Sequence, residues 1–225
     1  MKLTDKTTIH FDLDGTLIDS VPDLALAINE MLIMVDMENV EEETVRSWVG
    51  NGAQTLVKRA LLGKKEIDSL SVDTALFEEG LALFLKAYQK HLCHATTLYP
   101  NVKETLEVLK QKGYTLSIIT NKPIDFVEPL LMGLEIDEYF SAILGGDSLN
   151  EKKPHPLPLE HMCQTLDVSI ASSVMVGDSK NDILAANACG MDAIAVSYGY
   201  NYGEDIAQYK PLGVVDDFAT LLEYL

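Results

Sequence analysis

Short apolar segments rich in β-branched residues alternate along this chain with segments of helical pattern. Strands that alternate with helices are typical of a parallel sheet whose two faces are covered by helices. The sequence therefore predicts an α/β fold with a Rossmann-like parallel sheet core. The expected strands lie at residues 7–11, 115–119, 142–144, 173–176 and 193–196.

The segment between the first two expected strands breaks this alternation. Residues 21–95 show helical patterns only, at 21–34, 41–49, 53–62 and 73–93. This length is too great for a simple crossover between neighbouring strands, so it predicts an all-helical domain inserted after the first strand. We expect a core domain of residues 1–20 and 96–225 and an inserted helical domain of residues 21–95.

The charge balance restricts the ligands that such a chain can bind. Seventeen basic residues stand against 35 acidic ones, which gives a net charge of −18. This charge opposes binding to nucleic acid and to anionic membrane surfaces, and a small or metal-paired ligand fits it better. We therefore expect no nucleic-acid partner and no membrane partner.

The N-terminal residues lead into a strand and then into acidic residues, which leaves no room for the apolar centre of a signal peptide. No segment approaches the ~18 uninterrupted apolar residues of a membrane span. Cys93, Cys163 and Cys189 are unpatterned, which suggests reduced thiols rather than a disulfide frame or a zinc site. The sequence favours a cytoplasmic protein, as a monomer or a dimer.

The strongest chemical signal is the segment DLDGTL at residues 12–17, directly after the first expected strand. Alternation at the strand end predicts that Asp12 and Asp14 point in similar directions, and Gly15 allows a sharp turn. Two close carboxylates repel each other unless a proton or a cation lies between them, and oxygen ligands suit Mg²⁺. The alternative is a polar turn into a helix, capped by Asp.

A second acidic cluster follows another expected strand, in the segment GDSKND at residues 177–182. Asp178 ends the strand, and Asp182 falls one helical turn later on the same face. An ordinary helix start with Asp178 or Ser179 as its cap would look similar. Because two strands of one sheet end in acidic clusters, coincidence explains the pair less well than it explains either cluster alone.

Two further segments carry polar groups that suit a phosphate. Thr120 and Asn121 follow the strand at 115–119 and could hold phosphate oxygens, although both residue types are common at helix starts. Lys153 lies on the proline-stiffened loop KKPHP at residues 152–156 and could neutralise phosphoryl charge. Lys152 is a neighbouring candidate, and the alternative is a solvated basic loop.

Together, and in this order, the four segments resemble the four motifs of the haloacid dehalogenase superfamily over nearly the whole chain. The resemblance implies that the inserted helical domain is the movable cap of this family and that Mg²⁺ is the cofactor. The matching residues are Asp12, Asp14, Gly15 and Thr16 in the first motif, Thr120 in the second, Lys153 and Pro154 in the third, and Gly177, Asp178 and Asp182 in the fourth. The implied roles are phosphate binding for Thr120 and Lys153, magnesium binding for Asp12, Asp14 and Asp178, and a supporting acid behind the metal ligands for Asp182.

The same resemblance implies a reaction. Asp12 would be the nucleophile and Asp14 the general acid and base, and Asp14 favours phosphoryl transfer because dehalogenases and phosphonate-cleaving members generally lack an Asp there. The expected activity is magnesium-dependent hydrolysis of a small phosphorylated metabolite through an aspartyl-phosphate intermediate.

The segments WVGNGA at 48–53 and YGYN at 198–201 resemble bacterial phosphoglycolate phosphatases, which implies 2-phosphoglycolate as the substrate. The cap groups expected to recognise its carboxylate are Gly50, Asn51 and Gly52, through backbone amides, or Arg59; Arg46 is the other arginine. One alternative is another small sugar-phosphate phosphatase or a phosphomutase of the same superfamily. A phospho-aspartate signalling receiver is an alternative of a different class, although receivers are shorter and lack a helical insertion.

Overall fold

The computed structural model describes residues 3–67 and 71–225. Within these residues the main sheet has six strands, and all of its neighbouring pairs are parallel. The strands are β1 (Thr8–Phe11), β4 (Thr115–Ile119), β5 (Ala142–Leu144), β6 (Ser173–Gly177), β7 (Asp192–Val196) and β8 (Gly213–Val215). They lie in the order β5-β4-β1-β6-β7-β8. This sheet confirms the predicted α/β fold.

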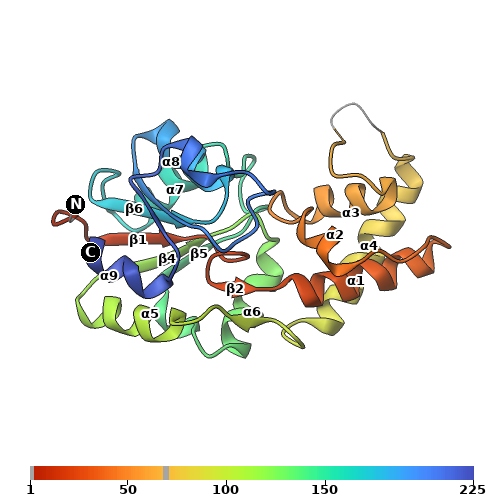
Figure 1. Cartoon of the computed structure of the whole chain (residues 1–225), viewed down its shortest axis with the longest axis horizontal. Helices are drawn as coiled ribbons and strands as arrows, with labels where there is room; N and C mark the ends of the chain where they lie inside the picture. The colour runs from red at the N-terminus through yellow and green to blue at the C-terminus, as the bar shows by residue number, and fades with distance from the viewer. Residues whose placement is uncertain (1–2, 68–70) are drawn as a thin grey trace.

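The helices fall into two groups. The first group forms one end of an elongated molecule, and the second covers the sheet at the other end (Figure 1). The first comprises α1 (Val21–Met34), α2 (Glu42–Arg46), α3 (Ala53–Leu62) and α4 (Thr74–His91). The second comprises α5 (Val102–Gln111), α6 (Val127–Gly133), α7 (Leu157–Thr165), α8 (Lys180–Cys189) and α9 (Leu221–Tyr224), with short 3₁₀ turns at Ile124–Phe126, Asp137–Tyr139, Ile206–Tyr209 and Phe218–Thr220.

Side chains of the parallel strands alternate between two helical layers, as the period of two in a strand requires. Ile9 and Phe11 of β1 belong to the hydrophobic cluster that α5, α6 and α9 complete. His10 lies between them and contacts Cys163 of α7, in the opposite layer. The two layers lie on either side of the sheet in Figure 1. Hydrophobic burial on both faces explains why these strands read as nearly continuous apolar runs.

The register of the strands places the polar residues at one edge of the sheet. Phe11, the last residue of β1, pairs with Ile118 of β4 and with Val176 of β6. Residues just beyond these positions leave the sheet together, because parallel strands end at a common edge. Asp12 and Asp178 therefore emerge side by side from two neighbouring strands.

The four helices α1–α4 pack around a hydrophobic cluster of their own. The observed bounds of α1 and α3 are the predicted ones, whereas α2 is shorter than the expected 41–49. Helix α4 begins after Asp73, whose carboxylate accepts a hydrogen bond from the backbone N–H of Leu76 at 3.0 Å. The helical insertion is thus present, and its division from the core at residues 20/21 and 95/96 stays a prediction.

The chain leaves the sheet and returns to it through a short antiparallel ribbon. This ribbon pairs β2 (Ile18–Asp19) with β3 (Thr97–Leu98). Asp23, in the first turn of α1, reinforces it by accepting hydrogen bonds from the backbone N–H groups of Ala95 at 2.8 Å and Thr96 at 2.9 Å. The sequence did not predict this ribbon or the edge strand β8. The two strands of the ribbon have only two residues each, which is too short for a periodic pattern.

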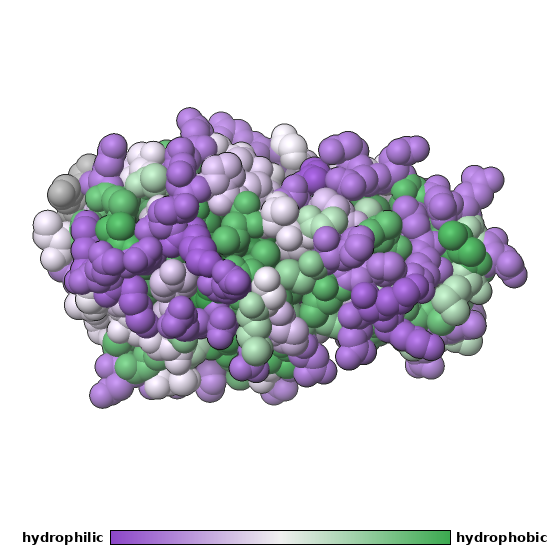
Figure 2. All heavy atoms as spheres, turned by 90° about the horizontal axis from the view of Figure 1, so that it is seen from below, coloured by the Kyte–Doolittle hydropathy of each residue, from purple (hydrophilic) through white to green (hydrophobic). Residues whose placement is uncertain are grey.

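The chain ends in a 3₁₀ turn followed by α9, with Phe218 and Leu221 buried against the sheet. Figure 2 shows hydrophilic side chains over both ends of one face and hydrophobic patches between them. In the described part of the chain, no helix is both long and apolar enough to cross a membrane.

Candidate active site

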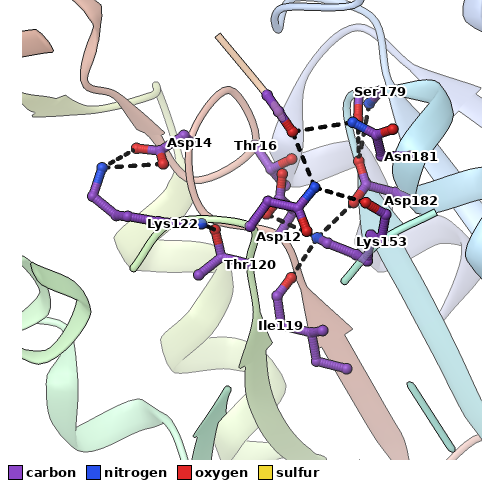
Figure 3. Close-up of polar contacts among 12 residues, drawn as sticks. Asp12, Asp14, Thr16, Ile119, Thr120, Lys122, Lys153, Ser179, Asn181 and Asp182 are labelled. Carbon is purple, nitrogen blue, oxygen red and sulfur yellow. Dashed lines mark hydrogen bonds and ion pairs between the residues drawn. The ribbon is translucent and has the colours of Figure 1, made fainter. Parts of the chain in front are cut away.

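Lys153 forms the centre of the polar cluster at the carboxyl edge of the sheet (Figure 3). Its buried ammonium lies 2.9 Å from Asp12 and 2.7 Å from Asp182, and it also donates to the carbonyl oxygen of Ile119. Burial lowers the pKa of Lys153, but Asp12 and Asp182 more than offset this, and the net pKa is raised. The lysine therefore carries a positive charge between two carboxylates.

Three carboxylates lie close together here, and two of them contact this lysine. Asp12, Asp178 and Asp182 each offer one oxygen, and these oxygens all lie within 4.8 Å of one another. Burial raises the pKa of Asp12 to about 6, against the opposing effect of Lys153. Burial, followed by the charges of Asp12 and Asp182, raises the pKa of Asp178 well above its usual value. One lysine does not balance three buried carboxylates, so the cluster has an excess of negative charge that suits a hard cation.

The three carboxylates are not equally free to bind a cation. Asp182 accepts from Lys153 with one oxygen and from the backbone N–H and the hydroxyl of Ser179 with the other, at 3.0 and 2.9 Å. Asp178 accepts one hydrogen bond on each oxygen, from the Thr16 hydroxyl at 3.0 Å and from a backbone N–H at 2.6 Å. Asp182 thus has its oxygens occupied and fixes Lys153 and the start of α8.

Asp14 takes a different partner from Asp12, although only Leu13 separates them in the sequence. Its carboxylate lies 2.9 and 3.1 Å from the ammonium of Lys122 and accepts a hydrogen bond from the Ser20 hydroxyl at 2.5 Å. The expectation that both carboxylates point in similar directions is thus only partly met, because they border one cavity but pair with different lysines. The chain has already left β1 at Phe11, so strand alternation no longer governs it.

Gly15 allows the chain after Asp14 to turn close to the side chain of Asp178. Its φ is +91°, a conformation that favours glycine, and an added Cβ would lie 2.3 Å from an oxygen of Asp178. The glycine therefore lets the first acidic segment approach the second closely enough for the Thr16 hydroxyl to reach Asp178.

Thr120 and Asn121 lie at the end of β4, as predicted, but they offer different groups. The Thr120 hydroxyl borders the cavity and accepts a hydrogen bond from the backbone N–H of Lys122 at 3.2 Å, which leaves its own proton free to donate. The Asn121 amide donates to the carbonyl oxygens of Gly50 at 3.1 Å and Lys153 at 2.9 Å. Asn121 thus ties the helical part to the sheet, and both of its N–H donors are already used.

A cavity of about 40 Å³ lies between the strand ends and the helices. Asp12 and Asp14 border it on the sheet side, and Leu24, Leu56 and Phe84 border it on the helical side. Its volume is enough for a few water molecules. The cavity therefore brings two carboxylates, the Thr120 hydroxyl and the Lys122 ammonium together in a small enclosure whose helical side is largely apolar.

Comparison with known families agrees with this geometry. A family profile described as "Haloacid dehalogenase-like hydrolase" matches residues 9–196, from the first strand of the sheet to the end of β7. The chain belongs to the haloacid dehalogenase-like hydrolases. All four acidic residues and both lysines described above fall within the matched range.

Relatives of this hydrolase are similar to it over nearly the whole chain. A protein of Colwellia psychrerythraea named phosphoglycolate phosphatase is 50% identical over 222 residues, which cover 99% of this chain and 98% of that protein. A protein of the same name from Pasteurella multocida is 45% identical, with coverage of 99% and 100%. A crystal structure from Haemophilus somnus, described as a predicted phosphoglycolate phosphatase, matches with a TM-score of 0.92 at 44% identity and covers 98% of each chain.

The cap residues expected to recognise the substrate divide into two groups in this hydrolase. Gly50 and Gly52 border the cavity that contains Asp12 and Asp14. Asn51 and Arg59 border a different depression, beside the Lys153 loop. The Arg59 guanidinium donates to the carbonyl oxygens of Lys65 at 2.9 Å and Trp48 at 2.5 Å, so it holds the cap loops together. Arg46 is likewise engaged, in an ion pair with Asp19 at 3.0 Å.

Sequence reasoning missed two polar residues that border the cavity, Lys122 and Tyr88. Lys122 directly follows the Thr120-Asn121 pair, so its position at a strand end could have drawn notice. Tyr88 lies in the middle of α4, where an aromatic residue at helical spacing indicates only core packing. Lys152, which the sequence left open as an aid to Lys153, donates instead to the carbonyl oxygen of Asn51 at 2.6 Å.

Proposed function

We propose that this hydrolase is a magnesium-dependent phosphomonoesterase that converts 2-phosphoglycolate to glycolate and phosphate. The observation that carries the proposal is the placement of Asp12 against Lys153 and Asp178, with Asp14 across the same small cavity. The names of the relatives, which cover nearly the whole chain, support the choice of substrate.

Asp12 and Asp178 are the proposed metal ligands. The excess negative charge of the buried cluster and the oxygen-only donor set fit Mg²⁺. When bound, the ion would offset the repulsion between a carboxylate and a phosphate oxygen. Asp14, which the sequence analysis included among the ligands, is left out of this set because its carboxylate is paired with Lys122.

The reaction follows from the positions of the two acids. Asp12 attacks phosphorus, the bond from phosphorus to the ester oxygen breaks, and Asp14 donates a proton to the leaving alkoxide. Asp14 then accepts a proton from a water molecule that attacks the aspartyl-phosphate, which releases phosphate and restores Asp12. The Thr120 hydroxyl donates to a phosphoryl oxygen during both steps, and the positive charge of Lys153 offsets phosphoryl charge.

Two further roles complete the proposal. Asn121 is not proposed as a phosphate ligand through its amide, because its N–H groups hold Gly50 and Lys153. Residues 21–95 act as a cap that closes over the cavity and limits the access of water. Tyr88 and Phe84 of α4 already border the cavity from this side.

A phosphate-release assay tests the proposal. Purified protein is given 2-phosphoglycolate, ethyl phosphate and hexose phosphates, each with Mg²⁺ and with excess chelator. We expect the highest kcat/KM for 2-phosphoglycolate and little turnover in chelator. Higher kcat/KM for hexose phosphates would favour the sugar-phosphate alternative, release that requires a bisphosphate activator would indicate a mutase, and phosphorylation without repeated turnover would indicate a signalling receiver.

A further inference from the structure

Two buried polar atoms without a hydrogen-bond partner border the cavity. Within the described residues three buried side-chain atoms lack a partner, namely Thr8 Oγ1, Tyr88 Oη and Asn121 Oδ1. Tyr88 and Asn121 both line the cavity that contains Asp12 and Asp14. A buried polar group left unpaired is destabilising, so the presence of two such residues in one lining indicates that a polar ligand completes the cavity.

Tyr88 offers a donor. Its side chain is 1% exposed, and burial raises its pKa, so the hydroxyl keeps its proton. Phe84 stacks on the ring at 5.8 Å between centroids, and Phe126 packs against it edge-on at 5.0 Å. These rings fix the orientation of the phenol, and they offer its hydroxyl no oxygen or nitrogen partner.

Lys122 offers a positive charge beside this donor. It is the one basic side chain among the described residues that line the cavity, and its ammonium lies 4.7 Å from the centroid of the Tyr88 ring. Burial lowers the pKa of Lys122, but Asp14 and Tyr88 more than offset this, so the lysine stays charged. Its two contacts to Asp14 leave one of its three donors, which lies near the Tyr88 hydroxyl.

Lys122 and Tyr88 lie away from Lys153, the lysine near which the phosphate is proposed to bind. Lys153 lies with Asp12 and Asp182, whereas Lys122 lies with Asp14 on the other side of the close-up (Figure 3). A short ligand with a phosphate near Lys153 would extend its other end past Asp14 toward Lys122. Because the remaining helical lining is apolar, that end must be compact and must have its charge matched by the lysine.

We propose that Lys122 and the Tyr88 hydroxyl bind the carboxylate of the substrate. The inference rests on the proposed function, and it assigns recognition of the tail to these two side chains instead of the glycine turn or Arg59. A carboxylate accepts from both donors. A substrate with a neutral tail leaves the Tyr88 hydroxyl unpaired. Lys122 and Tyr88 therefore also lower the affinity for substrates that lack a carboxylate.

Tyr88→Phe gives the cleaner test, because it removes only the unpaired hydroxyl. The readout is the ratio of kcat/KM for 2-phosphoglycolate to kcat/KM for ethyl phosphate, which has a tail of similar length without the carboxylate. We expect this ratio to fall about tenfold, the effect of one hydrogen bond to a charged group. The melting temperature should stay equal or rise, because the free protein loses an unsatisfied group. Tyr114→Phe, outside the cavity, is the matched control and should keep the wild-type ratio.

Lys122→Met gives a second readout that does not depend on turnover. Dissociation constants of 2-phosphoglycolate and ethyl phosphate are measured by calorimetry in an Asp12→Asn background, with Mg²⁺ present. We expect the affinity for 2-phosphoglycolate to fall at least about tenfold more than that for ethyl phosphate. Equal losses for the two ligands would show that Lys122 acts only on Asp14, and would overturn the proposal.

The outcomes separate this inference from the proposed function. If the wild-type protein hydrolyses 2-phosphoglycolate no better than ethyl phosphate, the proposed substrate is wrong and the carboxylate site is wrong with it. If the wild-type protein prefers 2-phosphoglycolate and both variants keep that preference, only the assignment to Lys122 and Tyr88 is overturned.

Discussion

At the scale of single residues, Asp12 and Asp14 show how one short segment supplies two different acids. Asp12 pairs with Lys153 inside the carboxylate cluster, whereas Asp14 pairs with Lys122 and Ser20 at the edge of the cavity. Neighbouring carboxyl groups in different surroundings can serve as nucleophile and proton carrier in one reaction. The proposed division of roles therefore follows from their partners.

Asp14→Asn should affect substrates with poor leaving groups most. An alkoxide needs a proton as it leaves, whereas an aryl oxide leaves without one, so kcat for an alkyl phosphate should fall about 10²–10⁴-fold and kcat for an aryl phosphate less. Single-turnover kinetics on both substrate types measure the bond-cleaving step. Equal losses in that step would contradict the role of Asp14 as general acid.

At the scale of elements, the glycine turn before α3 joins the helices to the sheet. Gly50 accepts hydrogen bonds from Asn121 at 3.1 Å and from Asn181 at 3.0 Å. Gly52 has a φ of +83°, and an added Cβ would lie 2.8 Å from the carbonyl oxygen of Asn121. Close backbone contact at this point explains why a turn that sequence reasoning assigned to substrate recognition is built of glycines.

Gly52→Ala, compared with a control glycine, should show that the close approach of Gly52 to Asn121 matters beyond the strain of a positive φ. The variant combines the cost of a positive φ, about 1–2 kcal/mol, with displacement of the turn from Asn121, so we expect lower stability and a KM raised severalfold. Gly63→Ala is the control, because its φ is +61° and nothing lies within 4 Å of the added atom. Urea unfolding and steady-state kinetics test both variants, and equal KM values for them would contradict the proposed contact.

His10 in the middle of β1 should make the stability of the sheet depend on pH. Its ring contacts the Ser117 hydroxyl at 2.7 Å and Cys163 at 3.5 Å, and burial lowers its pKa from 6.5 to about 4. Between these values the unfolded chain binds a proton that the folded chain does not, so stability falls as pH drops through this window. The loss approaches about 3 kcal/mol near pH 4.

Urea unfolding across this pH range, with chelator present, tests the role of His10. His10→Gln cannot titrate, so its stability should fall less steeply than that of the wild-type protein as pH drops from 6.5 to 4. Parallel pH profiles for the two proteins would show that His10 does not cause the loss.

At the scale of the whole molecule, a divalent cation should stabilise the fold. Because the buried carboxylates repel one another, Mg²⁺ at 100 times its dissociation constant should add about 2.7 kcal/mol and raise the melting temperature by about 5–10 °C relative to chelator. Asp178→Asn should reduce this increase, and the exposed Asp36→Asn should preserve it. An undiminished increase in Asp178→Asn would contradict the proposed ligand set.

The fold was largely predictable because long elements carry periodic patterns. The bounds of α1, α3, β4 and β5 agree with the sequence prediction, since each is bordered by turn residues or polar segments. The β2–β3 ribbon and β8 were missed. These short strands form because they pair with a strand elsewhere in the chain. Their own local sequence does not indicate which strand that is.

The sequence predicted those residues of the site that directly follow a strand of the sheet. Asp12 and Asp178 meet because β1 and β6 are neighbours in register. The alternation of strands and helices predicted that both strands end at one edge of a parallel sheet, but it did not predict that they are neighbours. The pairing of Asp14 with Lys122, and the contact of Lys122 with Tyr88, depend on how the helices pack over the sheet. Packing between distant segments leaves no signature in the sequence of either one.

Rapid-quench phosphoryl trapping tests the central claim, that Asp12 is the nucleophile, most directly. The protein is mixed with Mg²⁺ and 2-phosphoglycolate, quenched in acid within one turnover, and digested for mass spectrometry. We expect one phosphoryl group on the peptide that contains Asp12, and none in the folded Asp12→Asn variant, which should not turn over. A phosphoryl group on another residue, or full turnover by the Asp12→Asn variant, would contradict the account.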